Sequence, residues 1–477
     1  MSKAATIRSG TINLLNTIIG AGILAMPYGL KSNGLFFGCL LILWSSMTSS
    51  MGLYLQSKVA KYTAQTDAVS YFSLAQLTYP QLSIVFDSAI AIKCFGVGVS
   101  YLVVIGDLMP KIMESVGVSN NILMERNFWI TIFMAVIVVP LSYLKKLDSL
   151  KYTSIIALFS VVYLICLVFG HYIANDIVVD DRHVSWIGPV SIKSTLSSFP
   201  IFVFAYTCHQ NMFAIINELK PRMEAGQAGS KARQSNLIIR NAITVACTCY
   251  LAVGIVGYLT FGDAVNGNII TMYPKDSISS LIGRLSIVIM VSLSYPLQCH
   301  PCRGSVNHVL FYLTEGMSAK LRSSATDSAG QRHTGETQAL TTDMESIQSN
   351  QADESFVSTT PMEGAMDTDG HGPIVVPLTS KKFYIITTAI VTLSYLVAIT
   401  VTSLEHVLAF VGSTGSTSIS FILPGLFGYL LIKPIDGRVT LTTKEKFCKY
   451  GGLALAIWGV VVMIVCLSAT IFLGATH

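Results

Sequence analysis

A glycine-rich stretch interrupts the first apolar segment of the chain. Gly20, Ala21 and Gly22 lie in the middle of this segment, and Pro27 follows about a turn later. Glycine and proline both disfavour a continuous helix, and backbone that is not helical is tolerated at membrane depth only where it is buried in protein or lines a cavity. A half-helix that begins near Gly22 would direct free N–H groups at such a cavity, which suits a carboxylate. Close packing of small residues against another helix is the alternative interpretation.

The sixth apolar segment carries a second interruption. Pro200 lies early in it, and residues 206–211 (YTCHQN) are polar where a membrane span should be apolar. The two interruptions lie five spans apart, which is the spacing of two five-helix inverted repeats. Interrupted segments at corresponding places in two halves point to the binding site of a transporter, and the pair is more specific than either break alone.

Several ionisable residues lie within the apolar segments. Lys93 would cost about 2.5–3.5 kcal/mol at mid-span, so we expect it to face the interior of the bundle, with snorkelling as the alternative. His209 is the better proton candidate, because the second interruption would expose it to the cavity. Arg284 lies nearer a membrane edge, where snorkelling is expected. Cys299 and Cys302 stand without a second ligand pair, so no metal site is predicted.

The composition identifies the class of protein. The chain has 477 residues, of which 52% are hydrophobic and 12% charged. A soluble domain carries about a quarter charged residues, so a soluble globular protein is excluded. The net charge of +5 is small and gives no reason to expect a nucleic-acid partner. We therefore predict an all-α integral membrane protein in contact with the lipid bilayer.

The apolar runs are long enough for about eleven transmembrane helices, since each span needs about 20 apolar residues. We predict them at 6–30, 34–57, 82–110, 127–144, 150–174, 194–218, 236–260, 278–300, 383–404, 406–432 and 450–473.

The basic residues predict the topology. Most of the 31 lysine and arginine residues fall in the segments that share a side with the N-terminus, which indicates that this side is cytosolic. An odd number of spans then places the C-terminus on the other side. Residues 314–380 are rich in Ser, Thr, Gly, Asp, Glu and Gln, and we expect a disordered cytosolic loop there. It is either a solvated linker or a phosphorylated regulatory segment.

Six strings of residues give the chain a resemblance to the amino acid/auxin permease family, and within it to the fungal vacuolar amino acid transporters. They are NTIIGAGILAMPYGLK, IKCFGVGVSYLVVIGDLMP, LDSLKYTS, FPIFVFAYTCHQNMF, GYLTFGD and YPLQCHPCR. The resemblance spans nearly all of residues 1–475 except the polar loop.

The resemblance implies a LeuT-like fold, in which 5+5 inverted repeats are followed by one C-terminal helix. It also implies alternating access around a site at the middle of the membrane. The first repeat would then comprise 1–174, and the second would comprise 194–313 and 381–432. The loop 314–380 would divide the second repeat, and 433–477 would hold the eleventh helix and the C-terminus.

The resemblance also implies a substrate site between the two interruptions. The substrate carboxylate would meet N–H groups near Gly20, Ala21 and Gly22, with Thr17 beside them. The substrate amino group would meet carbonyl oxygens of the second interruption, at Phe204, Ala205 and Tyr206.

The coupling ion follows from the same resemblance. In sodium-coupled relatives an asparagine of the first helix and a hydroxyl residue of the eighth help to hold the cation. Asn16 and Ser294 occupy these positions, but relatives often have threonine where Ser294 stands, so sodium is less favoured than a proton. The candidates for ion coupling are therefore Asn16, Ser294, His209 and Lys93.

Together these features predict a proton-coupled secondary transporter that exports amino acids from the vacuole to the cytosol. It would lie in the vacuolar membrane, with a cytosolic N-terminus and a lumenal C-terminus, and would need no cofactor. No enzymatic motif is found, and no oligomeric state is predicted. The alternative function is an amino acid sensor that signals through the loop 314–380.

Overall fold

The computed structural model describes residues 6–63, 69–79, 82–118, 120–144, 153–179, 182–219, 227–329, 378–434 and 440–474. These residues are helical and contain no β-strand. The chain divides into two compact units, the first made of Met1–Val309 and Pro377–His477 and the second of Leu310–Val376. The first unit, called the main unit below, contains both interruptions.

Nine helical segments among the described residues are long and apolar enough to cross a membrane, and a bent pair makes a tenth. The bent pair is α1 (Ile7–Ile18) with Ala21–Asn33, which meet at 48°. A shorter apolar helix, Arg126–Ser142, occupies the place of the predicted fourth span. The nine are α3 (Leu35–Val59), α5 (Ser83–Ser115), α8 (Thr153–Ala174), α9 (Ile192–Ala205) with α10 (His209–Glu218), α11 (Gln227–Phe261), α12 (Ile278–Ala329), α13 (Ser380–Thr400), α14 (Leu404–Val411) with α15 (Leu423–Leu431), and α16 (Thr443–Gly474).

The prediction of an all-helical membrane protein is therefore confirmed, and each predicted span has a helical counterpart. The count of eleven spans and the 5+5 repeat stay predictions. α12 continues to Ala329, past the predicted start of the polar loop at residue 314, since the good helix formers Ala, Lys, Leu and Arg recur there. Residues 330–377 lie outside the described part of the chain, so the disorder predicted for them is untested.

Two spans contain π-helical turns that were not predicted from the sequence. In the fourth span, Met134–Val138 is π-helical between α6 (Arg126–Phe133) and α7 (Val139–Ser142), and Pro140 lies inside α7. In the tenth, Gly412–Ser416 and Ser418–Ile422 precede α15, which has Pro424 near its start. Each π-helical stretch lies just before a proline, which cannot donate to the preceding turn.

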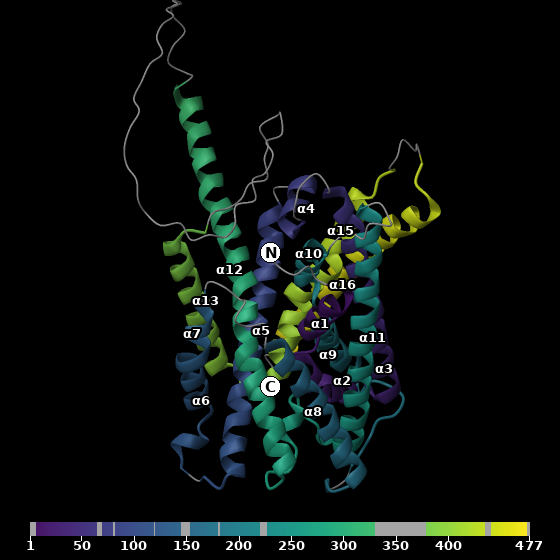
Figure 1. Ribbon diagram of the computed structural model, residues 1–477, viewed down its shortest axis with the longest axis vertical. Helices are drawn as coiled ribbons and strands as arrows, with labels where there is room; N and C mark the ends of the chain where they lie inside the picture. Colours follow the sequence, from purple (N-terminus) through teal and green to yellow (C-terminus); the bar gives the residue numbers. More distant parts are fainter. Residues whose placement is uncertain are drawn as a thin grey trace, which may run out of the picture. The chain divides into compact units, whose positions relative to one another are not determined.

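A short helix outside the candidate spans was also not predicted. This is α4 (Tyr71–Thr78), which begins with a capping box formed by Ser70 and Ser73. In Figure 1 it lies at the upper end of the main unit. A helix of eight residues is too short to show a periodic hydrophobic pattern, so the capping residues Ser70 and Ser73 were its strongest signal in the sequence.

The interrupted spans lie in the interior of the main unit. α11 packs against α1, α2 (Met26–Asn33) and α3, while α9 packs against α2, α14 and α16. α5 in turn packs against α13 and α14. Figure 1 accordingly shows α1, α2 and α9 between α5 and α12 on one side and α3 and α11 on the other. Both interruptions are therefore surrounded by uninterrupted helices.

Arg284 corrects one sequence-based expectation. Its side chain is fully buried rather than extended to a membrane edge. The guanidinium donates to the carbonyl oxygen of Tyr273 at 2.5 Å and to the Ser115 hydroxyl at 2.9 Å. The prediction of snorkelling was wrong because a turn of the loop before α12 supplies carbonyl acceptors inside the protein.

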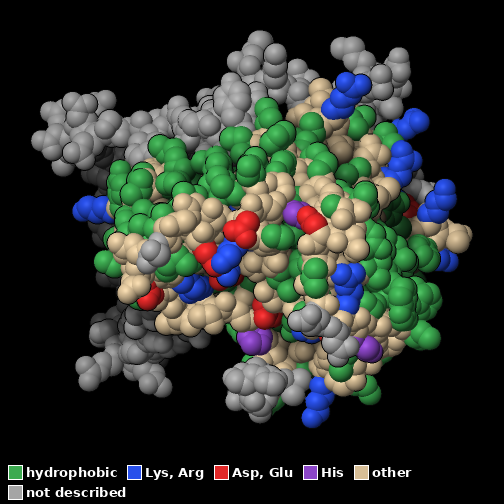
Figure 2. Space-filling model, turned by 90° about the horizontal axis from the view of Figure 1, so that it is seen from below, with side chains coloured by type: hydrophobic (Ala, Val, Ile, Leu, Met, Phe, Trp, Pro, Cys, Tyr) green, Lys and Arg blue, Asp and Glu red, His purple; other side chains and the backbone are tan. Residues whose placement is uncertain are grey.

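The lower end of the main unit carries most of its ion pairs. Figure 2 shows acidic, basic and histidine side chains over the middle of this face, with hydrophobic side chains beside them. A membrane protein is expected to carry its charged groups at the ends that meet water. The pairs there are Lys275–Glu114 at 3.2 Å, Lys111–Glu114 at 3.5 Å, Arg126–Asp107 at 3.4 Å, His183–Asp263 at 2.7 Å and His171–Asp176 at 2.8 Å.

Candidate functional site

The first interruption leaves two backbone N–H groups free at the start of a helix. α1 ends at Ile18, and a 3-10 turn over Ala21–Ala25 leads into α2. Gly20 precedes this turn with non-helical dihedrals, φ −138° and ψ −140°. The N–H groups of Ala21 and Gly22 open the new helix, so they have no partner within it. This is the geometry that the sequence predicted for a carboxylate site.

The second interruption is a three-residue break between α9 and α10. α9 ends at Ala205, and α10 starts at His209. Thr207 provides donors for two carbonyl oxygens at the end of α9. Its hydroxyl donates to the Val203 carbonyl oxygen at 2.7 Å, and its N–H donates to the Phe204 carbonyl oxygen at 3.0 Å. The predicted polar run therefore does break the sixth span.

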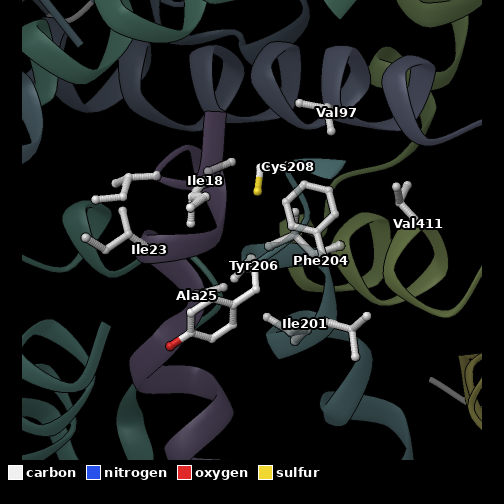
Figure 3. Packing of buried hydrophobic residues seen from close by; sticks show 14 of the residues in the cluster. Ile18, Ile23, Ala25, Val97, Ile201, Phe204, Tyr206, Cys208 and Val411 are labelled. Carbon is white, nitrogen blue, oxygen red and sulfur yellow. The ribbon is translucent and has the colours of Figure 1, made fainter. Parts of the chain in front are cut away.

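The two interruptions are in direct contact. A Cβ added at Gly22 would lie 2.9 Å from both Cα and Cβ of Ala205, so only glycine allows this approach without a shift. Figure 3 shows Ile18 of the first span near Cys208 and Phe204 of the second, in the space between the two ribbons. The fold thus brings together two breaks that are almost 200 positions apart in the sequence.

Thr17 ties the two spans together instead of presenting a free hydroxyl. Its Oγ1 accepts a hydrogen bond from the Asn211 amide at 2.8 Å and donates to the Asn13 carbonyl oxygen at 2.9 Å. Its predicted contact with substrate is therefore replaced, in this conformation, by a contact between α1 and α10.

The predicted carbonyl acceptors are partly engaged within the protein. The Phe204 carbonyl oxygen accepts from the Thr207 N–H, and the Ala205 carbonyl oxygen accepts from the Tyr250 hydroxyl at 2.8 Å. The ring of Tyr206 lies edge-on to Tyr250, with centroids 5.1 Å apart. These acceptors therefore lie at the break as predicted, but protein donors share them.

His209 is fully buried beside α3. Its Nε2 lies 3.1 Å from the Ser49 carbonyl oxygen, so this nitrogen carries the proton in the neutral ring. Nδ1 has no hydrogen-bond partner among the described residues. A Cβ at Gly52 would lie 2.7 Å from Nε2, so α3 leaves the ring little space. Within the described ranges, the imidazole is therefore fixed through one nitrogen only.

Lys93 faces the interior of the bundle, as predicted, with 2% of the residue exposed. A Cβ at Gly415 would lie 2.7 Å from the Lys93 backbone nitrogen, so α5 is closely packed against the tenth span here. The structure shows no hydrogen bond or ion pair for the ammonium group within the described ranges. Its charge is close enough to interact with the thiol of Cys208 at the second interruption.

The two sodium-site candidates lie on different helices. Asn16 is half-buried on α1 and makes contacts within the protein. Ser294 is half-buried on α12. Their predicted joint role in holding a cation stays a prediction.

Three further residues at the site were not found from the sequence. Tyr250 contacts both interruptions, and Ser420 of the tenth span donates to the Thr207 hydroxyl at 3.2 Å. The Tyr101 hydroxyl would lie 3.2 Å from a Cβ at Gly20. Each is one of several hydroxyl residues in its span, so no local pattern distinguishes it from the others.

The chain matches known proteins along almost its whole length. The family described as "Transmembrane amino acid transporter protein" matches residues 3–465. "Vacuolar amino acid transporter 6" of Saccharomyces cerevisiae is 46% identical, over 98% of this chain and 100% of the relative. "Vacuolar amino acid transporter 5" of the same yeast is 39% identical, over 99% of both chains. The human "Sodium-coupled neutral amino acid transporter 7" is 24% identical, over 66% of this chain and 68% of the relative.

The family match and the two yeast relatives cover both interruptions and the helices that surround them. They confirm the resemblance inferred from the sequence, and the names of the family and of these relatives denote transporters, not enzymes. The chain therefore belongs to the transmembrane amino acid transporter protein family.

Proposed function

We propose that this protein is a proton-coupled secondary transporter that moves amino acids from the vacuolar lumen to the cytosol. The observation that carries the proposal is the direct contact between the two interrupted spans, at Gly22 and Ala205. Two yeast relatives that match it end to end are named vacuolar amino acid transporters. The bias of basic residues towards the N-terminal side supports a cytosolic N-terminus and a lumenal C-terminus.

The amino acid binds between the half-helices. The free N–H groups at Ala21 and Gly22 lie at a positive helix end and take the substrate carboxylate. The carbonyl oxygens at the end of α9, around Ala205 and Tyr206, take the ammonium group. Apolar neighbours of the break, such as Ile18 and Phe204 (Figure 3), surround the rest of the substrate.

Alternating access then works around this fixed site. A LeuT-like 5+5 arrangement is supported by the positions of the breaks in the first and sixth spans, which are equivalent places in two five-helix repeats. Half-helices that meet at a break can tilt separately, so the site is able to open to one side of the membrane at a time.

Two buried groups support coupling to protons. His209 has one ring nitrogen fixed by Ser49 and the other without a partner among the described residues. Lys93 is a buried ammonium within electrostatic range of the same break. Both can exchange a proton during the cycle. Sodium coupling has less support, since Ser294 stands where sodium-coupled relatives often have threonine.

Uptake into proteoliposomes tests this proposal. The purified protein is reconstituted and supplied with a labelled amino acid mixture under three conditions, namely a pH gradient without sodium, a sodium gradient without a pH gradient, and neither. We expect concentrative uptake with the pH gradient alone. Uptake driven only by sodium would contradict proton coupling, and no uptake under any condition would contradict transport itself.

A further inference from the structure

One tyrosine hydroxyl lies where both broken spans end. The Tyr250 hydroxyl oxygen is 2.8 Å from the carbonyl oxygen of Ile18 and 2.8 Å from that of Ala205. Ile18 is the last residue of α1, and Ala205 is the last residue of α9. Tyr250 itself belongs to α11, which is not interrupted, and is fully buried. A side chain of a continuous helix thus reaches the C-terminal ends of both half-helices.

The electrostatics of this junction call for a positive group. The last carbonyl oxygens of a helix have no partner within the helix, and its C-terminus carries about −0.5 of an elementary charge. Two such ends that converge in a buried place repel one another. The phenol proton, shared between the two oxygens, offsets this repulsion. An unpaired buried carbonyl would cost about 1–3 kcal/mol, so the contact stabilises this arrangement of the two spans.

The phenol ring is itself fixed. The ring of Tyr206 packs edge-on against it, at an interplanar angle of 79°. α11 also packs closely against α1 and α2. The hydroxyl therefore has a defined position relative to the first span, and the end of α9 is held to that position through Ala205.

We propose that Tyr250 is a positioning residue that joins the two interrupted spans and so sets the distance between the groups that receive the two ends of an amino acid. The inference rests on the proposed function and names a residue for that same site. Loss of the hydroxyl leaves both half-helix ends without this donor, and the second break loosens from the first.

Tyr250→Phe removes only the hydroxyl and keeps the ring. Tyr258→Phe is the matched control: Tyr258 is also fully buried on α11, but its hydroxyl contacts Asp263 and the Ser185 N–H, both outside the interruptions. Thermal unfolding of both variants in detergent verifies that each is folded.

The first measurement needs no transport. Cys208 lies in the second break and is fully buried. We expect Tyr250→Phe to raise the rate of Cys208 alkylation by N-ethylmaleimide at least fivefold, as followed by mass spectrometry of the Cys208 peptide, and Tyr258→Phe to leave it unchanged. An unchanged rate in Tyr250→Phe, or an equal rise in both variants, would overturn the inference.

The second measurement is the KM of uptake, which we expect Tyr250→Phe to raise about tenfold and Tyr258→Phe to leave alone. If the unmodified protein transports and Tyr250→Phe matches it in both KM and alkylation, the role of Tyr250 is wrong while the proposed function stands. If the unmodified protein does not transport but Cys208 is exposed in Tyr250→Phe alone, the proposed function fails and the structural role of Tyr250 stands.

Discussion

At the scale of single residues, we expect the buried ammonium of Lys93 to destabilise the fold and to be needed for proton-coupled uptake. A buried ammonium without a partner is unfavourable, by about 2.5–3.5 kcal/mol at the centre of a span. We expect Lys93→Met to stabilise the fold by about 2 kcal/mol and to abolish uptake driven by a pH gradient. The thermal unfolding midpoint in detergent and proteoliposome uptake measure the two effects.

Lys111→Met serves as the control for this substitution. Lys111 lies on the same helix, but its side chain is 48% exposed and its ion pair with Glu114 is on the surface, where such pairs contribute little. Neither stability nor uptake should change in this variant. A Lys93→Met protein that is less stable than the unmodified one would show that Lys93 is structural.

His209 gives a prediction about pH. The Nδ1 of His209, which has no partner in the described part of the chain, can accept a proton during the cycle, while a glutamine amide can still donate to the Ser49 carbonyl oxygen without titrating. We expect uptake by the unmodified protein to rise as the lumenal pH falls from 8 to 5, and uptake by His209→Gln to be at least tenfold lower and insensitive to pH over this range. A pH profile in the variant that parallels the original would exclude His209 as the proton carrier.

The sequence identified some residues of the site and missed others for a physical reason. A membrane span is expected to be a continuous apolar helix. Two stretches depart from this expectation within their own segments, Gly20–Gly22 and the polar run 206–211, so both were found from the sequence. Tyr250 lies in a continuous helix and departs from no such expectation. Its role exists only because the fold places the ends of α1 and α9 within reach of one hydroxyl, which no pattern within α11 reveals.

At the scale of helices, α4 is linked to the second break through side chains. The Gln56 amide donates to the Tyr71 hydroxyl and, at 3.2 Å, to the His209 carbonyl oxygen. The Tyr71 hydroxyl donates to the Ile419 carbonyl oxygen at 3.1 Å. Burial raises the pKa of the Tyr71 phenol well above its ordinary value, so it stays protonated and keeps this donor.

Tyr71→Phe should therefore weaken the attachment of α4. The loss removes one of the two acceptors of the Gln56 amide and the hydroxyl donor of the Ile419 carbonyl oxygen, which costs about 1–3 kcal/mol. We expect amide hydrogen exchange in α4 to accelerate at least tenfold. Tyr79, which lies just after the same helix, is half exposed. Amide hydrogen exchange in α4 of Tyr79→Phe should therefore match that of the unmodified protein. Equal exchange rates in the two variants would show that the hydroxyl of Tyr71 does not hold α4.

Helix boundaries followed from the sequence where hydrophobicity alone decides them. α3 and α13 lie within a few residues of their predicted positions. The π-helical turns before Pro140 and Pro424 were missed, because apolar length does not reveal how a span accommodates a proline. α4 was missed because its attachment depends on Gln56 and Ile419, which are distant in the sequence.

At the scale of the whole molecule, the chain separates into a main unit and a second unit, Leu310–Val376. Both interruptions lie in the main unit. We expect replacement of residues 331–377 by a short Gly/Ser linker to leave the KM and the maximal rate of uptake within about twofold of the full chain. A Gly/Ser linker is flexible and imposes no structure on the segments that it joins. Loss of uptake would show that the segment is needed for transport and would revive the sensor interpretation.

The all-helical membrane class could be predicted from the sequence because the bilayer restricts the structures that can cross it. Composition alone excluded a soluble fold, and the spacing of two breaks indicated a transporter. The contact between Gly22 and Ala205 could not be predicted from the residues alone. It depends on the packing of the first span against α9, whereas the spacing of the breaks indicated only that the two belong to one site.

The central claim is that the two interruptions form one amino acid site, and a single added methyl group tests it. Gly22→Ala places a Cβ 2.9 Å from Ala205 Cα, whereas Gly170→Ala on α8 places one where no atom lies within 4 Å. The measurement is uptake of labelled amino acids into proteoliposomes under a pH gradient without sodium. The account predicts at least a tenfold loss for Gly22→Ala and none for Gly170→Ala, with both proteins folded. Undiminished uptake by Gly22→Ala would contradict it.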